Sequence, residues 1–389
     1  MMTTRERTLN TLRRSRPDRI PWLADLAYWI DYLFDEGLMP EKYLREESNR
    51  EPQSIISQGL AGRFSEDGLQ ALHRDLNVGF YLQGYFPFTT HYDGVEITEA
   101  VTRNGRDLSR VTTIHTPYGD MREIWDYICD THSWAPREHM IKGLSDLKKL
   151  RYLYEHTRYE PDYDLAGRRY TSAGDNGVVL CYIPKCPIME LIALRAGVMT
   201  TAYMMMDDEK EMELTLALME EKIDESCKLA LDSPAECIMS PDNLSSESIG
   251  VPFYTRFGKP FHQKWCDRIR ERGKFSFVHL DGTIKPLISE LSDAGFDVIE
   301  ALTPHPVGDI PFSEIRPLVK PETILWGGIP AGFFRELNDE DFDAYVKALI
   351  LAMKADGRSV LAVGDQVVPG SSFERVARVA RLVEEHGKY

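Results

Sequence analysis

The stretch FSFVHLDG, residues 275–282, decides the fold. Its first four residues are mostly apolar, and His279, Asp281 and Gly282 follow them. A short run of aromatic and β-branched residues that ends in a turn signal is typical of a buried strand. Glycine then permits the turn into a following helical segment. A strand of this kind, followed by a helix, is the repeating unit of a parallel α/β sheet.

Similar apolar runs recur along the chain, and helical stretches separate them. Including the opening stretch, strands are predicted at 19–25, 75–81, 177–184, 235–241, 274–280, 296–302, 323–328 and 359–364. Eight strands that alternate with helices are what a closed (β/α)8 barrel requires, so we predict the α/β class and a TIM barrel. A long helix-rich stretch is predicted at 187–231, and further helices are predicted at 285–294, 339–355 and 373–386.

Two parts of the chain lie outside this alternation. Residues 3–16 form a predicted amphipathic helix with an exposed basic face, which gives the barrel an N-terminal helical extension. Residues 82–135 contain the turn pairs DG at 93–94 and NG at 104–105, which predict an antiparallel β insertion. The aromatic residues of this insertion either roof a pocket or contact a second subunit. No repeat or flexible linker divides the chain, so 1–389 is expected to form one domain.

The overall composition excludes several classes of partner. The chain is 43% hydrophobic and 28% charged, with a formal net charge of −16, and this balance argues against a surface for nucleic acid. The N-terminal residues lead into charged side chains, so we expect neither a signal peptide nor a membrane span, and a cytoplasmic location. The six cysteines form no CxxC pair and no spacing typical of structural zinc sites, which predicts reduced, buried thiols.

Polar side chains follow five of the predicted strands. They are Asp25, Asp242 with Asn243, His279 with Asp281, Glu300, and Asp365. The carboxyl ends of the strands form the catalytic face of a (β/α)8 barrel, so these side chains are expected to lie near one another. His279 and Asp281 are the strongest candidates, because residues two apart on a strand point to the same side.

This set of side chains supports two kinds of chemistry. His279, Asp281, Glu300 and Asp365 offer nitrogen and oxygen ligands that a divalent ion such as zinc accepts. Without a metal, His279 and Asp281 could instead serve as catalytic acid and base. The sequence leaves both uses open.

Further residues are predicted to contact a substrate. Asp25 lies at the first strand end, and Asp242 and Asn243 are suited to hydrogen bonding, although a helix cap or a turn explains that pair equally well. His305 lies in a proline-rich loop after Glu300, where it either reaches the pocket or faces solvent.

Five segments, in this order along the chain, resemble the uroporphyrinogen-decarboxylase superfamily. They are residues 5–21, TPYG at 116–119, SFVHLDG at 276–282, GGI at 327–329, and residues 364–369. The superfamily includes porphyrinogen decarboxylases and cobamide-dependent methyltransferases, and the resemblance covers nearly the whole chain. It implies a (β/α)8 barrel whose pocket lies at the carboxyl ends of the strands.

The methyltransferase branch resembles the chain better than the decarboxylases do. Porphyrinogen decarboxylases carry an arginine-containing segment after the first strand, whereas this chain reads LAYWIDY at 26–32, where Trp29 is a further substrate-binding candidate. In the methyltransferases, a His-x-Cys pair, a Glu and a later Cys hold zinc. The resemblance places these ligands at His279, Asp281, Glu300 and Asp365, with aspartate in place of both cysteines.

The resemblance implies a corrinoid-dependent methyltransferase with a zinc ion. It would take the methyl group of a small methyl donor, for example by O-demethylation of a methoxylated compound, and the corrinoid would be supplied by a partner protein. A homodimer is a further expectation. Two alternatives stay open, namely a metal-free decarboxylase or lyase in which His279 and Asp281 handle protons, and a non-catalytic barrel that binds a small molecule or a corrinoid.

Overall fold

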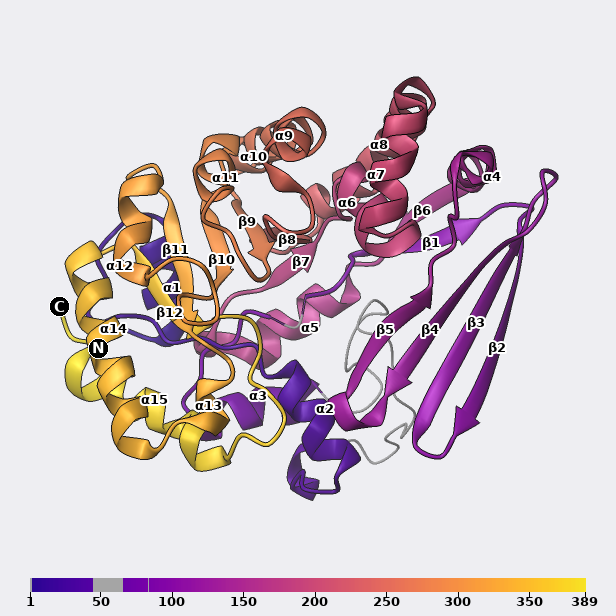
Figure 1. Cartoon of the computed structure of the whole chain (residues 1–389). Helices are drawn as coiled ribbons and strands as arrows, with labels where there is room; N and C mark the ends of the chain where they lie inside the picture. The colour runs from indigo at the N-terminus through magenta and orange to yellow at the C-terminus, as the bar shows by residue number, and fades with distance from the viewer. Residues whose placement is uncertain (1, 45–65, 83) are drawn as a thin grey trace.

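A parallel six-stranded sheet forms the centre of the molecule (Figure 1). The computed structural model describes residues 2–44, 66–82 and 84–389. The strands are β7 (Leu180–Tyr182), β8 (Cys237–Leu244), β9 (Phe275–Leu280), β10 (Val298–Leu302), β11 (Ile324–Ile329) and β12 (Ser359–Val363). They lie side by side in the order β12-β11-β10-β9-β8-β7, so neighbours in the sequence are neighbours in the sheet.

Two extended segments close this sheet into a ring. Trp22 forms a parallel bridge to Leu361 of β12, Leu23 bridges to Gly79, and Phe80 bridges to Gly177 just before β7. The ring therefore has eight parallel members, and the predicted (β/α)8 barrel is confirmed. The segments predicted as strands at 19–25 and 75–81 form isolated bridges and no continuous ladder. Pro21 has no amide to donate in the first segment, and the helix before the second one runs to Asp75.

Alternate residues of the strands fill the inside of the barrel. Trp326 lies at its centre, with ring centroids 4.7 Å from Tyr81 and 5.4 Å from Phe277. All three rings are fully buried. Because the side-chain period of a strand is two, His279 follows Phe277 on the inward face, beyond this packed aromatic layer. The polar side chains at the carboxyl ends of the strands therefore lie directly above this aromatic layer.

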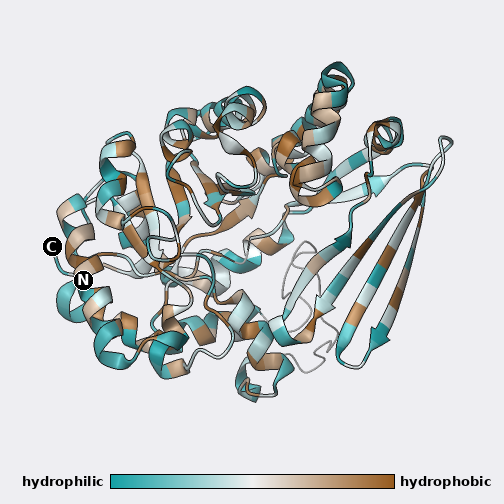
Figure 2. Ribbon diagram, viewed as in Figure 1, coloured by the Kyte–Doolittle hydropathy of each residue, from teal (hydrophilic) through white to brown (hydrophobic). Residues whose placement is uncertain are grey.

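Helices cover the outside of the barrel, and the strands between them are the most hydrophobic part of the molecule (Figure 2). The helices are α1 (Thr4–Leu12), α2 (Ala27–Asp35), α3 (Glu66–Asp75), α4 (Leu144–Glu155), α5 (Asp164–Ala173), α6 (Pro187–Glu190), α7 (Val198–Asp207), α8 (Glu209–Asp232), α9 (Gly250–Phe253), α10 (Lys259–Glu271), α11 (Ile288–Ala294), α12 (Phe312–Ile315), α13 (Phe333–Glu336), α14 (Asp339–Asp356) and α15 (Phe373–His386). Within the described ranges, none of them combines the length and the hydrophobicity that crossing a bilayer needs.

The helix-rich stretch predicted at 187–231 contains α6, α7 and α8, with two interruptions between them. A π-helical turn at Leu191–Arg195 follows α6, and Gly197, at φ 80°, separates that turn from α7. Asp208 then ends α7 and caps α8, because its carboxylate accepts a hydrogen bond from the amide of Glu211. The other predicted helices agree closely with α11, α14 and α15.

Helix α1 closes the amino end of the barrel. Leu12 is fully buried with the residues that fill the barrel. Arg7 is buried and pairs with Asp18 at 2.6 Å, and Arg14 pairs with Asp297 at 2.5 Å. The expected exposed basic face is therefore only partly present, because Arg7 is buried in an ion pair, whereas Arg13, Arg14 and Arg16 are exposed.

The antiparallel insertion forms two small sheets on one side of the barrel. β1 (Phe88–Tyr92) pairs with β6 (Thr157–Pro161), and this ribbon leads to a four-stranded sheet. That sheet contains β2 (Glu96–Asn104), β3 (Asp107–His115), β4 (Met121–Ile128) and β5 (Ser133–Glu138), in this order. Teal and brown alternate along its strands, as expected for sheets with two different faces (Figure 2). The β-rich region thus continues past residue 135, to Pro161.

Candidate functional site

His279 and Glu300 form the centre of the candidate site. They are paired residues of the neighbouring strands β9 and β10, and His279 Nδ1 lies 2.7 Å from Glu300 Oε2. Glu300 is fully buried, and its other oxygen accepts a 2.7 Å hydrogen bond from the Tyr81 hydroxyl. The carboxylate thus fixes the imidazole through Nδ1 and leaves Nε2 directed elsewhere.

Two aspartates from the first and last members of the barrel approach this pair. His279 Nε2 lies 3.8 Å from Asp365 Oδ1, in the segment that follows β12. The Asp365 side chain is 47% exposed, so a ligand can reach it. Asp25 is buried beside it, in a parallel bridge to Gln366, and accepts a 2.8 Å hydrogen bond from the amide of Ala27. Four of the predicted residues are therefore gathered at the carboxyl end of the barrel.

Burial and the neighbouring charges shift the pKa of three groups in the recess. Burial raises the pKa of Asp25 to about 7, against the hydrogen bond from Ala27, and the charges of Asp365 and Glu300 add to the rise. The partial burial of Asp365 also raises its pKa, to about 6, and the charges of Asp281 and Glu300 add to the rise, although His279 opposes it. Burial alone would lower the pKa of His279, but Glu300 and the neighbouring aspartates outweigh it and raise the pKa to about 9.

These shifts define the charge of the site near neutral pH. His279 is a cation paired with Glu300, while Asp25 and Asp365 titrate close to neutrality. A carboxyl group that holds a proton near pH 7 is one whose negative charge lacks compensation. The recess therefore favours a further cation, whether a proton, a metal ion or a positively charged group of a ligand.

Asp281 and Asn243 lie at the rim of this recess and are exposed. Asn243 donates a 3.2 Å hydrogen bond from Nδ2 to Asp281 Oδ2 and accepts a 2.9 Å hydrogen bond from Lys185 Nζ. Burial lowers the pKa of Lys185, although Asp242 and other acids oppose the shift. Lys185 lies just after β7. The rule that polar residues at the carboxyl ends of the strands form the site would have identified it, had it been applied to β7. Tyr81 was expected among the aromatic residues that roof a pocket or contact a second subunit, but its hydrogen bond to Glu300 was not predicted.

The fit of a metal ion to the predicted ligands is partial. His279 Nε2 and Asp365 face each other, but Glu300 Oε2 is engaged by His279 Nδ1, and Asp281 binds Asn243. Across the described part of the chain, no three of the four predicted ligands bring their donor atoms within 4.8 Å of one another. The geometry fits an ion held by His279 and Asp365, with Glu300 as the carboxylate that orients the histidine.

Three predicted substrate contacts lie away from this recess. Asp242 is fully buried and binds His262 Nε2 at 2.5 Å, because the end of β8 turns its carboxylate toward α10. Trp29 is buried against Phe373 and donates its indole N–H to the carbonyl of Ser371 at 2.7 Å. His305 is exposed, and among the described residues no hydrogen bond or ion pair joins its imidazole to the site.

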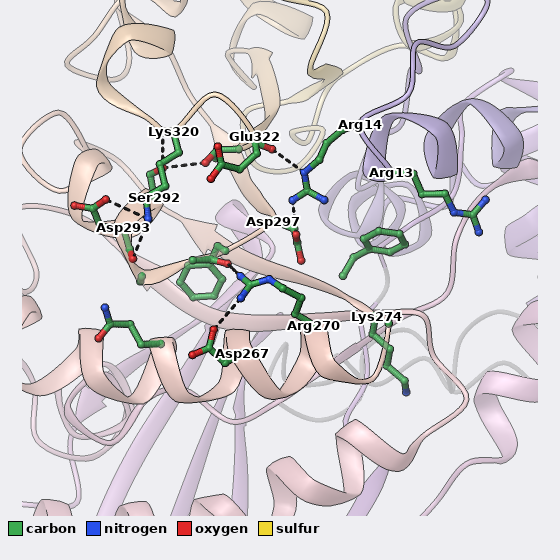
Figure 3. A pocket seen from close by; sticks show the side chains of 17 residues that line it. Arg13, Arg14, Asp267, Arg270, Lys274, Ser292, Asp293, Asp297, Lys320 and Glu322 are labelled. Carbon is green, nitrogen blue, oxygen red and sulfur yellow. Dashed lines mark hydrogen bonds and ion pairs between the residues drawn. The ribbon is translucent and has the colours of Figure 1, made fainter.

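A cavity of about 900 Å³ lies at the opposite end of the barrel (Figure 3). It is lined by residues that precede β9, β10 and β11, among them Lys274, Asp297 and Thr323. Most of its charged side chains are already paired, for example Arg14 with Asp297 and Arg270 with Asp267. The cavity is therefore separate from the candidate site, and the aromatic layer of the barrel lies between them.

Comparison with known proteins gives one family and a set of similar folds. The family model described as uroporphyrinogen decarboxylase (URO-D) matches residues 165–386. A methyltransferase from Methanosarcina mazei has a similar structure, with a TM-score of 0.63 and 14% identity over 99% of both chains. A Listeria monocytogenes protein assigned as a vitamin-B12 independent methionine synthase gives a TM-score of 0.43 and 11% identity, over 95% of this chain and 98% of its own. No curated protein matches the chain.

Proposed function

This chain belongs to the uroporphyrinogen decarboxylase (URO-D) family, and on that premise we propose that it is a corrinoid-dependent methyltransferase. It would move the methyl group of a small methylated substrate, such as a methoxylated compound, to a corrinoid carried by a partner protein. A homodimer in the cytoplasm belongs to the same proposal.

The observation that carries this proposal is the acid-rich recess around His279. When a methyl group leaves oxygen or nitrogen, negative charge develops on the atom left behind, and a cation or a proton donor placed there lowers the barrier. A zinc ion that displaces the proton from His279 Nε2 would be held by this nitrogen and by Asp365 Oδ1, 3.8 Å away, and would polarise that atom. Glu300 keeps the imidazole oriented, and Tyr81 holds Glu300 in place.

A specific observation also favours the decarboxylase as a second candidate. Asp25 is a buried carboxyl group with a pKa of about 7, in the electrostatic field of His279. A group of this kind can donate a proton to a carbanion-like intermediate without a metal. In that case Asp25 would join His279 and Asp281 in handling protons.

Transfer of a methyl group to free cob(I)alamin tests the first proposal. A panel of methoxylated compounds and methylamines is offered to zinc-loaded protein, and methylcobalamin formation is followed by absorbance. His279→Ala and Asp365→Ala should each lower the rate about 10²–10⁴-fold. Asp267→Ala, at the opposite end of the barrel, is the matched control and should keep the full rate.

The alternatives give different results in the same experiment. Release of carbon dioxide from a carboxylated substrate by metal-free protein, with no methyl transfer, would establish the decarboxylase. Saturable substrate binding without turnover in either assay would leave a binding protein. Zinc content measured on each variant distinguishes a lost metal from lost acid–base chemistry.

A further inference from the structure

A second cluster of metal-binding side chains joins the insertion to helix α2. Cys129 and His132 flank the short turn between β4 and β5, with the spacing Cys-x-x-His, and Glu36 follows the last residue of α2. We propose that Cys129, His132 and Glu36 form a divalent metal site suited to Zn²⁺, which we call the α2 clasp. It is independent of the proposed function and of the recess around His279.

The ligand atoms of the α2 clasp lie close enough together to converge on one ion. One ligand atom from each of the three residues lies within 4.8 Å of the other two, and His132 Nε2 is 3.8 Å from a Glu36 carboxylate oxygen. Ligand atoms around a tetrahedral zinc ion lie roughly 3.3–3.6 Å apart, given bond lengths of about 2.0–2.3 Å. A contraction of a few tenths of an ångström to about one ångström, within the reach of the Glu36 side chain, would complete the site.

The backbone and a neighbouring carboxylate aim the histidine at the other two ligands. His132 adopts a left-handed conformation, with φ 51° and ψ 37°, at the end of the 3-10 turn Cys129–Thr131. Its Nδ1 lies 3.3 Å from Asp35 Oδ2, and Asp35 also accepts a hydrogen bond from the Tyr127 hydroxyl. A carboxylate on one ring nitrogen fixes the tautomer and leaves the other nitrogen free to bind metal.

Burial and charge also suit a metal ion. Cys129 and His132 are each 6% exposed, whereas the Glu36 side chain is 35% exposed and leaves a path from solvent. Arg106 forms an ion pair with the Glu36 carboxylate, with a guanidinium nitrogen 2.5 Å from Oε1. Since the Arg106 side chain is 59% exposed, it can withdraw when a metal enters.

A second group of possible metal ligands has no histidine nitrogen available for a metal ion. Cys186, Asp242 and His262 also bring their ligand atoms together and are buried. Both ring nitrogens of His262 are engaged there, Nε2 by Asp242 at 2.5 Å and Nδ1 by the Tyr254 hydroxyl at 3.1 Å. That group is a satisfied hydrogen-bond network, so Cys186 provides a matched control for Cys129.

The α2 clasp would fix the insertion relative to the catalytic end of the barrel. Helix α2 begins two residues after Asp25, and the amide of Tyr28 donates to Gln366 Oε1 at 2.9 Å, next to Asp365. On the other side, the Tyr28 hydroxyl donates to the carbonyl of Thr131, in the turn that carries the two metal ligands. A metal ion at the clasp would therefore stabilise the contact between this turn and α2.

Cobalt(II) titration of the full chain tests the proposal, because cobalt bound to a thiolate gives a charge-transfer absorption that zinc lacks. We expect one equivalent of Co²⁺ to produce this absorption and Zn²⁺ to displace it. Cys129→Ser should abolish the absorption, whereas Cys186→Ser and His279→Ala should retain it. The His279 variant separates this site from any metal in the recess, so the two proposals can fail independently.

Two further variants report on the geometry without removing a ligand. Asp35→Asn should weaken Co²⁺ binding about 10–100-fold, because it loosens the histidine. Arg106→Ala should strengthen binding, because it frees Glu36. Circular dichroism of each variant verifies the fold. Absence of the thiolate absorption in the wild-type chain, its survival in Cys129→Ser, its loss in Cys186→Ser, or weaker binding in Arg106→Ala would each overturn the α2 clasp.

Discussion

At the scale of single residues, Asp25 shows how the fold sets the chemistry of the recess. It is buried and its pKa is raised to about 7 from an ordinary value of 3.8, so the folded chain holds this proton more tightly than the unfolded chain. The stability that this group contributes is complete below pH 3.8 and is lost as the pH rises through about 7. Above pH 7 the buried carboxylate therefore opposes folding.

Asp25→Asn should remove this dependence on pH. The asparagine keeps an oxygen for the amide of Ala27 but cannot ionise, so the free energy of unfolding of the variant should exceed that of the wild type by as much as about 4 kcal/mol at pH 8. Urea unfolding at pH 5 and pH 8 measures this difference, which should widen as the pH rises. Asp175→Asn, at an exposed turn, should show a constant difference. The same constancy for Asp25→Asn would contradict the raised pKa.

The residues of the recess illustrate what a sequence can predict at this scale. The rule that polar side chains follow parallel strands identified Asp25, His279, Glu300 and Asp365, because it depends only on strand direction. The same rule singled out Asp242, which lies outside the recess and binds His262, since position along the chain does not tell which neighbour a side chain meets. The ion pair of His279 with Glu300 also needed the register of β9 and β10, which strand patterns leave undetermined.

At the scale of elements, residues 78–82 are joined to each neighbouring member of the barrel by one isolated bridge. Gly177 lies where this segment bridges to β7, and a Cβ atom on it would lie 1.8 Å from the carbonyl oxygen of Phe80. Because the backbone fixes the position of a Cβ atom and the oxygen itself belongs to the backbone, neither can move unless the two barrel members separate. The close approach therefore requires glycine.

Gly177→Ala should lower the free energy of unfolding by more than about 3 kcal/mol, because it forces the barrel open at this point. Chemical denaturation provides the measurement. Gly167→Ala is the control, since that residue lies in α5 with open space around it and should gain about 0.5–1 kcal/mol. Equal stability of Gly177→Ala and the wild type would mean that the bridge between Phe80 and Gly177 does not form.

Elements with a strong period were predictable, and those held by tertiary contacts were not. The patterns at 339–355 and 373–386 gave α14 and α15 within a residue or two, because each carries its own cap and apolar face. The segments at 19–25 and 75–81 have apolar patterns too, but only neighbouring strands decide how many ladder hydrogen bonds they make. The continuation of the antiparallel region to β6 depends on its pairing with β1, whose residues lie 65 to 73 positions earlier in the chain than their partners.

At the scale of the whole molecule, the two ends of the chain meet beside α1 (Figure 1). Arg19 forms an antiparallel bridge with Lys388, and the guanidinium of Arg16 lies 4.5 Å from the ring centroid of Tyr389. The amide of Tyr389 also donates to the carbonyl of Asp18 at 3.3 Å. The last two residues thus hold the segment that leads into the first member of the barrel.

Removal of Lys388 and Tyr389 should cost about 1–2 kcal/mol and lower the Tm by a few degrees, because a bridge and a cation–π contact are lost. Differential scanning calorimetry measures the change. Tyr389→Phe keeps both the ring and the backbone contact, so it should leave the Tm unchanged. A truncated chain that melts with the wild type would show that these contacts contribute nothing to stability.

The pairing of β1 with β6 has a consequence for how such a chain could change over generations. The two strands lie at the start and at the end of the long insertion and pair with each other. The chain therefore leaves the barrel and returns to it at nearly the same place, as it would for a short hairpin. The entropic cost of closing a loop grows only with the logarithm of its length. Here the pairing of β1 with β6 already holds the two ends of the insertion together. The sheet beyond the ribbon can therefore lengthen, shorten or acquire new surfaces while the eight barrel members keep their register.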